Sequence, residues 1–312
     1  MPRPVKHPLR RRLERFGARA VAAVFSTVAR VVPLSWCRAM GRLGGYALYA
    51  VSPRRQRLAD ANLVAAFGDR YSPAERRAIR MAVARNMATL FVELFKISTF
   101  TREQIIEVMP SEGGEHMRNA LARGKGAIMI SAHYGNWEVA GARLAAEGFD
   151  VAVVARDASD AQVASIINAS RKGAQLRVIG RNDLRAMVGH LRGNGVLAIL
   201  PDQHSNENPV RVSFLGRPAW CAKGPATLAL RTGCAVVPGF GFRMPDGSLR
   251  GYCLEEIPLP DTADREQAIA ELMQRIYDVI GAQITAHPEQ WLWFHNRWKE
   301  YTPPDAAART PR

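Results

Sequence analysis

A histidine and a carboxylate, His133 and Glu138, lie five positions apart directly after the apolar run 126–130. An imidazole that takes a proton from a hydroxyl, with an acid to orient it, can activate an alcohol as a nucleophile. On one continuous helix the two side chains would diverge by about 140°, so the chain must bend between them. Gly135 permits an unusual backbone angle and Asn136 can cap a helix, so we expect a strand-to-helix corner across which Glu138 faces the ring.

Other interpretations of this segment remain open. His133 could be a partly buried loop histidine, and Glu138 an acid stabilised by the dipole of a first helical turn. A hydrolase could use Ser131 as its nucleophile, although the chain has no G-x-S-x-G elbow. A metal site could combine the pair with Asp202 and His204, but no H-E-x-x-H or comparable ligand spacing is present.

Three more residues stand where a binding site is expected. Asp202 and Gln203 follow the apolar run 196–200, and functional loops lie at the carboxyl ends of parallel strands. Asp202 could instead only cap a turn. Lys223 precedes Gly224 at the start of a predicted helix, where it could bind an anionic headgroup. A solvated lysine is the alternative for that position.

Hydrophobic periodicity predicts the elements that hold these residues. Apolar runs that read as strands alternate with amphipathic stretches that read as helices, at 127–131, 138–147, 151–155, 161–171, 177–179, 182–192 and 196–200. This alternation predicts an α/β fold with a largely parallel sheet flanked by helices. Two further strands, 235–240 and 250–257, surround the turn 245–247 and predict a hairpin, which makes the sheet mixed. Longer helices are expected at 73–97, capped by Ser72, and at 264–285.

The composition limits the class of partner. The 312 residues are 47% hydrophobic, enough for a full core, and carry a formal net charge of +15. Such a surface attracts polyanions, which include nucleic acid, anionic lipid headgroups and an acidic carrier protein. The chain has no zinc-finger or RNA-binding motif, so we expect no nucleic acid partner. The four cysteines show no C-x-x-C pair, which indicates reduced thiols on the cytosolic side of a membrane.

The first fifty residues form a separate segment. A helix over 12–32 would place valines and phenylalanines on one half of its circumference and arginines on the other. This basic amphipathic pattern suits the plane of an anionic membrane. A spanning helix needs roughly 20 mostly apolar residues, and the apolar run 20–29 ends at Arg30, so lying on the membrane is favoured over spanning it. Packing on the protein core is the alternative.

The segment Ser131–Glu138 also resembles the His-x-x-x-x-Asp/Glu signature of the lysophospholipid acyltransferase superfamily. Its form is similar to that of the bacterial lipid A late acyltransferases, the lauroyl and myristoyl transferases. Other positions agree with that family in the family's order, namely Asn62-Leu63, Phe67, Asn86, Glu93, Arg156, 200–203, 214–219, 223–226, 236–238, 288–293 and 297–299. The resemblance covers most of the chain from about residue 50. Residues 157–160 depart from the Pro and Asn of many lipid A enzymes, which bears on the acceptor more than on the reaction.

The resemblance implies transfer of a fatty acyl group from an acyl carrier protein or CoA thioester to a hydroxyl of a membrane glycolipid, with a lipid A precursor as the expected acceptor. A mannosylated phosphoinositide, an aminolipid or a lysophospholipid is the alternative acceptor. His133 would act as general base, Glu138 would orient it, and Arg156 would bind phosphate or steady the oxyanion. Asp202, Gln203 and Lys223 would contact substrate, and no cofactor or metal is implied.

The resemblance also implies a location and a division of the chain. The enzyme would work at the cytoplasmic face of the cell inner membrane. We expect an N-terminal membrane-associating helical segment at 1–50, an acyltransferase domain at 51–302 and a disordered tail at 303–312.

Overall fold

The computed structural model describes residues 27, 31–155 and 161–301. Most of the helix expected at 12–32 lies outside these residues, as does the tail at 303–312. Those two predictions, and the domain boundary at residue 50, therefore stay predictions.

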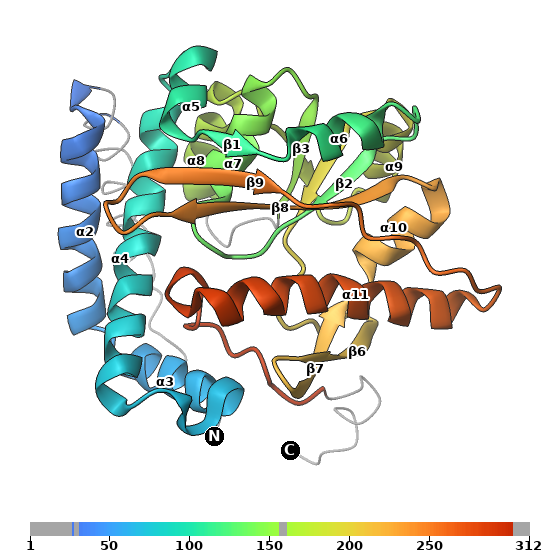
Figure 1. The fold of residues 1–312 in the computed structure, drawn as a ribbon. Helices are drawn as coiled ribbons and strands as arrows, with labels where there is room; N and C mark the ends of the chain where they lie inside the picture. The colour runs from blue at the N-terminus through green and yellow to red at the C-terminus, as the bar shows by residue number, and fades with distance from the viewer. Residues whose placement is uncertain (1–26, 28–30, 156–160, 302–312) are drawn as a thin grey trace.

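A seven-stranded sheet forms the centre of the molecule (Figure 1). Its strands are β1 (Ser111–Glu112), β2 (Ala127–Ile130), β3 (Val151–Ala155), β4 (Arg177–Gly180), β5 (Val196–Ile199), β8 (Ala235–Arg243) and β9 (Leu249–Cys253). They lie in the order β1-β9-β8-β2-β5-β3-β4, and β8 with β9 is the antiparallel pair in an otherwise parallel sheet. The predicted mixed, largely parallel sheet flanked by helices is confirmed.

Helices cover both faces of this sheet. They are α5 (Arg102–Val108), α6 (Gly114–Leu121), α7 (Trp137–Ala146), α8 (Ala161–Gly173), α9 (Leu184–Arg192), α10 (Gly224–Thr232) and α11 (Arg265–Ala286). Successive side chains of a strand point to opposite faces, and β2 shows this directly. Ile128 and Ile130 pack with α9, α10 and α11, whereas Ala127 and Met129 pack with α5, α6 and α7. The catalytic candidates follow strands that are buried on both sides.

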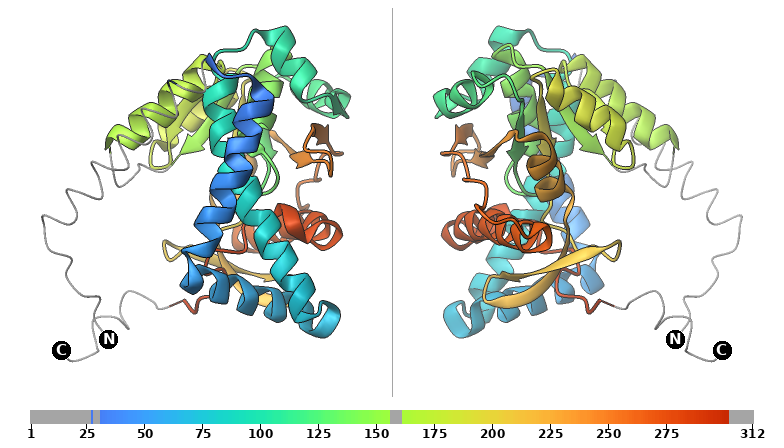
Figure 2. Two further views of the ribbon diagram at one scale, coloured as in Figure 1. Left: turned by 90° about the vertical axis from the view of Figure 1, so that its left-hand side faces the viewer. Right: turned by 90° about the vertical axis from the view of Figure 1, so that its right-hand side faces the viewer.

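Three helices precede the sheet and stand beside it, α2 (Leu34–Ala50), α3 (Pro53–Phe67) and α4 (Pro73–Ile97). The predicted start of α4 is confirmed, because Ser72 and Glu75 form a reciprocal capping box. Helix α2 packs lengthwise on α4 (Figures 1 and 2). Gly41 and Gly45 make this close approach possible, since a Cβ there would lie 2.6 Å and 2.4 Å from the backbone Cα atoms of α4. Among the described residues, no helix combines the length and apolar content needed to cross a bilayer.

A small hairpin below α11 was not predicted. Strands β6 (Pro209–Phe214) and β7 (Arg217–Ala222) pair with each other outside the main sheet and pack on α11 (Figure 1). Leu215 and Gly216 turn the chain between them, both at positive φ, +51° and +74°. A leucine at such an angle is uncommon, and the familiar Asn-Gly signal of a two-residue turn is missing here. The short helices η1 (Gly68–Arg70) and η2 (Pro288–Gln290) complete the fold.

Candidate active site

The predicted strand-to-helix corner is present between β2 and α7. Strand β2 ends at Ile130, and Asn136 caps α7 by accepting a hydrogen bond from the backbone N–H of Val139 at 3.0 Å. Gly135 has φ +55°, and a Cβ at this position would lie 1.7 Å from the carbonyl oxygen of Gly241. Only glycine fits that turn, so the local sequence sets the bend that carries the histidine.

The carboxylate that holds the histidine ring is Asp202, in the loop after β5. Asp202 Oδ1 lies 2.8 Å from His133 Nδ1, and Oδ2 accepts from the backbone N–H of His133 at 3.0 Å. Trp291 donates its indole N–H to the same Oδ2 at 2.8 Å. Asp202 is 1% exposed, whereas the His133 side chain is 23% exposed. The pair is thus anchored at its acid end and open to solvent at its base end.

The electrostatics of this pair fix the state of the ring. Burial would raise the pKa of Asp202, but the facing imidazole and three hydrogen bonds hold the pKa below its ordinary value. Burial would likewise lower the pKa of His133, and the Asp202 carboxylate reverses this and raises it. Because Asp202 is ionised, Nδ1 must carry the proton that joins the two groups. Nε2 is then the nitrogen with the basic lone pair.

Glu138 does not hold the ring, which corrects the expected contact across the corner. Its two oxygens accept from Arg171 of α8, at 2.6 Å from Nη2 and 3.0 Å from Nε. The Trp137 indole donates to the same carboxylate at 3.3 Å. A fork of guanidinium donors satisfies a buried carboxylate better than one imidazole N–H does. Glu138 therefore acts on His133 through its nearby charge, which helps to raise the pKa of the ring.

Of the other predicted site residues, Gln203 contacts the His133 ring and Lys223 does not. The amide nitrogen of Gln203 lies 3.2 Å from His133 Nε2, so this residue meets the basic face of the ring. Lys223 stands at the start of α10, 3.4 Å from the carboxylate of Glu266, and does not line the groove beside His133. Arg156 lies outside the described residues. The substrate-binding roles of these residues, like the catalytic roles of the pair, stay proposals.

A groove of about 480 Å³ opens beside His133. The polar side chains of its lining are those of Ser131, His133, Glu138, Asn168, Arg171, Arg181, Gln203, His204 and Ser205. Apolar side chains of β3, β4, β5 and α8 also line it, among them Val153, Val154, Ala155, Ala164, Ile167, Val178, Ala198 and Ile199, with Leu200 directly after β5. This is the composition of a site that binds an apolar chain and orients one reactive end. A larger cavity, about 700 Å³, lies between α4 and the β8–β9 turn and includes none of the residues that contact His133.

Two alternative chemistries find little support in this geometry. Ser131 lines the groove, but its hydroxyl is buried and makes no hydrogen bond to any described residue, so no base activates it. Among residues 31–155 and 161–301, no three His, Cys, Asp or Glu side chains are close enough together to hold a metal ion.

Sequence reasoning missed two residues that shape the site. Arg171 lies 33 positions after the carboxylate it binds, and an arginine in an amphipathic helix carries no signal of such a contact. Trp291 is a core residue with 1% exposure. Its indole N–H nevertheless belongs to the site, since it fixes Asp202. A buried tryptophan must place its N–H on some acceptor, and that rule was the available signal.

Comparison with known sequences identifies the family. The sequence model of bacterial lipid A biosynthesis acyltransferases matches residues 3–300. The chain belongs to the bacterial lipid A biosynthesis acyltransferase family. This confirms the resemblance seen in the motifs and places the chain among the acyltransferases.

Curated relatives carry two kinds of name. The chain is 26% identical over 213 residues to the phosphatidylinositol mannoside acyltransferase of Mycobacterium tuberculosis (strain ATCC 25618 / H37Rv), with 66% of each sequence covered. It is 24% identical over 250 residues, 79% of each sequence, to the lipid A biosynthesis palmitoleoyltransferase of Escherichia coli (strain K12). The lauroyltransferase of the same organism is 26% identical over 192 residues, 60% of each sequence. The match thus spans just under two thirds of the mycobacterial relative.

Proposed function

We propose that this protein transfers a fatty acyl group from a thioester to a hydroxyl of a membrane glycolipid, with His133 as general base. The observation that carries the proposal is the imidazole ring held by buried Asp202, at the wall of a groove that many apolar side chains line. The relatives' names support a lipid acceptor, with a lipid A precursor first and a mannosylated phosphoinositide second. An aminolipid or a lysophospholipid is a further acceptor to test.

The proposed reaction needs only the groups already described. Nε2 removes the proton from the acceptor hydroxyl as its oxygen attacks the thioester carbonyl. Asp202 stabilises the imidazolium that forms and keeps Nδ1 protonated. The carbon–sulfur bond then breaks, and the imidazolium returns the proton to the leaving thiolate, so no covalent enzyme intermediate forms. Gln203 now occupies Nε2, so the acceptor hydroxyl must displace its amide, which becomes free to donate to the oxyanion.

Arg156 and Lys223 are the remaining candidates, and we propose that they bind substrate rather than react with it. Arg156 follows β3, whose last residues line the groove, and we propose that it binds a phosphate or steadies the oxyanion. Lys223 precedes Pro225, which also lines the groove, and we propose that it binds an anionic group at the entrance. The net charge of +15 attracts acidic proteins, which favours an acidic acyl carrier protein as the donor.

Filling the groove should change which acyl chain is transferred. Ile167 lies on α8 among the groove's apolar residues, and Ile167→Trp would shorten the space for the chain. We expect kcat/KM for long acyl donors to fall at least about tenfold while short donors keep most of their rate, because each buried CH₂ contributes about 0.8 kcal/mol. The measurement is transfer from acyl carrier protein and CoA thioesters of graded length to lipid A precursor, phosphoinositide mannoside and lysophospholipid.

The matched control is Ile106→Trp, which adds the same ring to an exposed position of α5. It should leave the chain-length profile unchanged. An Ile167→Trp protein with the profile of the wild type would remove the groove from the proposed acyl site, and transfer to none of the acceptors would contradict the proposed function.

We also propose that the protein docks on the cytoplasmic face of the inner membrane, with α2 contributing to the contact. The face of α2 turned away from α4 exposes Trp36 and Leu43, at 69% and 68%, and Val51, directly after the helix, is 75% exposed. Exposed apolar residues on one helix face, flanked by Arg42, suit the boundary of an anionic bilayer. The basic amphipathic helix predicted at 12–32, which precedes α2 in the sequence, would extend this contact.

The double variant Trp36→Glu/Leu43→Glu should bind anionic vesicles about 100-fold more weakly than the wild type. Each large apolar side chain contributes roughly 1.5–3 kcal/mol when it leaves water. Co-sedimentation with phosphatidylglycerol vesicles measures the effect, and Leu184→Glu, at a leucine of α9 that is 46% exposed, is the control. Equal binding by the wild type, the double variant and the control would show that α2 does not contact the membrane.

A further inference from the structure

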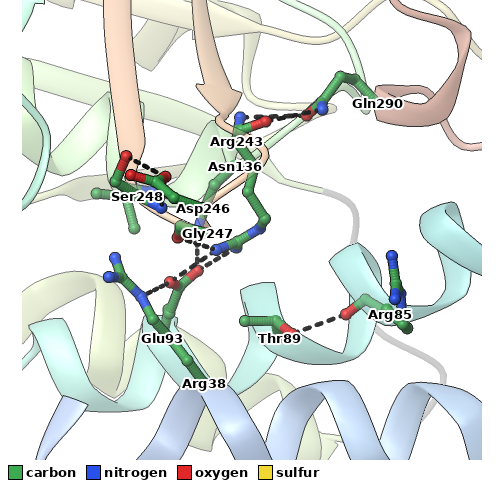
Figure 3. Close-up of polar contacts among 11 residues, drawn as sticks. Arg38, Arg85, Thr89, Glu93, Asn136, Arg243, Asp246, Gly247, Ser248 and Gln290 are labelled. Carbon is green, nitrogen blue, oxygen red and sulfur yellow. Dashed lines mark hydrogen bonds and ion pairs between the residues drawn. The ribbon is translucent and has the colours of Figure 1, made fainter. Parts of the chain in front are cut away.

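A buried ionic cluster centred on Glu93 lies outside the groove and takes no part in the chemistry described above. Glu93, on α4, is 0% exposed. Its carboxylate accepts from Arg38 Nε of α2 at 2.7 Å, from Asn136 Nδ2 at 2.6 Å, and from both terminal nitrogens of Arg243 of β8 (Figure 3). One side chain thus joins two other elements to the corner that carries His133.

The charge state of the cluster follows from its partners. Burial would raise the pKa of Glu93, but the guanidinium groups of Arg243 and Arg38 outweigh it and hold the pKa below its ordinary value. The carboxylate is therefore ionised and accepts from every partner. An ionised acceptor makes shorter and stronger hydrogen bonds than a neutral one, so Glu93 fixes the direction of the Asn136 amide.

Asn136 is the point at which the corner is fastened. It is 0% exposed, its oxygen caps α7 through the Val139 N–H, and its backbone N–H donates to Gly241 at 3.0 Å. Its amide nitrogen donates to Glu93, so three polar groups of Asn136 make hydrogen bonds to three different parts of the fold. Asn136 stands three residues after His133 and two before Glu138. Any rotation of this side chain would shift the start of α7 and the ring together.

Arg243 ties the cluster to the opposite side of the same corner. Its backbone N–H and C=O exchange two hydrogen bonds with the side chain of Gln290, at 3.2 and 3.0 Å. The carbonyl oxygen of Gln290 in turn accepts from the backbone N–H of Gly135 at 2.8 Å. Figure 3 shows the Glu93 and Gln290 contacts converging on Arg243. The corner is thus held on two sides by one connected set of buried groups.

We propose that Glu93 is a positioning residue for acyl transfer: it fixes Asn136, and through it the placement of His133 at the groove. Arg38 makes this placement depend on how α2 sits against α4. The proposal rests on the proposed function of His133. Shifts of about 1 Å in a catalytic group can cost 100-fold in rate, so the expected effect is on kcat rather than on KM.

A polarity swap tests the proposal. Asn136→Asp alone places a second carboxylate against Glu93 and should lower kcat about 100-fold. Glu93→Gln alone removes the charge that the two arginines need and should also lower kcat. The double variant Glu93→Gln/Asn136→Asp has the same net charge as the wild-type pair. Its amide at position 93 can donate to the carboxylate at position 136, and aspartate is also a good cap for α7. We expect it to recover kcat to within about tenfold of the wild type, with KM unchanged throughout.

Unfolding midpoints of all the variants separate positioning from loss of fold. A double variant that is as folded as the wild type yet no faster than the single variants would overturn the proposal. So would an Asn136→Asp protein with wild-type kcat. If Glu93→Gln does not fold, Arg38→Lys takes its place: it keeps the charge, loses the Nε contact, and should lower kcat about tenfold, and an unchanged kcat there would overturn the proposal. Parallel assay of His133→Gln shows whether the proposed function itself has failed.

Discussion

His133→Gln should lower kcat for acyl transfer by about 1000-fold, because general base catalysis typically contributes 10²–10⁴. Glutamine is similar in size and can still donate to Asp202, so the corner should keep its shape, but it has no basic nitrogen to take the hydroxyl proton. Acyl transfer from a labelled carrier thioester to the best acceptor, under saturating substrate, measures the loss. KM should change little, since the proposed acyl site is the groove, and the variant leaves the apolar side chains of its lining in place.

The control for this variant is its unfolding midpoint, which should stay within a few degrees of the wild type. Leu184→Gln, on the exposed side of α9, accounts for non-specific effects of adding an amide. A folded His133→Gln protein that keeps more than a tenth of the wild-type kcat would exclude the histidine as the base.

Asp202→Asn should produce the second largest loss, between about 100-fold and 10 000-fold in kcat. The asparagine can present its amide to Nδ1, which forces the ring proton onto Nε2 and removes the base. The variant should also change the pH dependence. His133 must be neutral to act, so kcat/KM of the wild type rises with pH and reaches half its maximum above 6.5, because Asp202 raises the pKa of the ring. Without that charge, burial lowers the pKa, and the midpoint moves to lower pH.

A pH profile of kcat/KM for both proteins tests the sign of this shift. Asp69→Asn, an exposed carboxylate in η1, should leave the midpoint unchanged. A midpoint for Asp202→Asn that equals or exceeds that of the wild type would show that the carboxylate does not set the basicity of His133.

Local rules predicted the corner because its causes are local. Ser72 with Glu75, and Gly135 with Asn136, act within a few residues, so the sequence alone located the start of α4 and the bend before α7. The alternation of strands and helices could be predicted because central strands such as β2 and β5 are buried on both faces and appear as short apolar runs. The turn at 245–247 revealed the antiparallel pair for the same local reason.

Long-range pairing was not readable. Asp202 is 69 residues from the ring it holds, and only the parallel order of β2 and β5 brings the two loops together. Glu138 was expected to hold the ring because it is near in sequence, but Arg171 of α8 satisfies it better in the fold. The choice between two nearby carboxylates depends on where the arginine lies, and one sequence does not contain that information.

The hairpin β6–β7 was missed for a different reason. Its turn uses Leu215 at positive φ, against the preference of leucine, and the tertiary contacts of the hairpin with α11 outweigh that preference. Elements that depend on packing rather than on local turn chemistry are the ones that periodicity fails to show.

The most direct test of the central claim is the kcat of the double variant His133→Gln/Asp202→Asn beside the two single variants. If Asp202 acts on the reaction only through the ring, its removal has nothing further to impair once the ring is gone. We therefore expect the double variant to match His133→Gln within about threefold, the non-additive behaviour of residues that work as one unit. Losses that multiply would contradict the account, because they would mean that the carboxylate and the imidazole act separately.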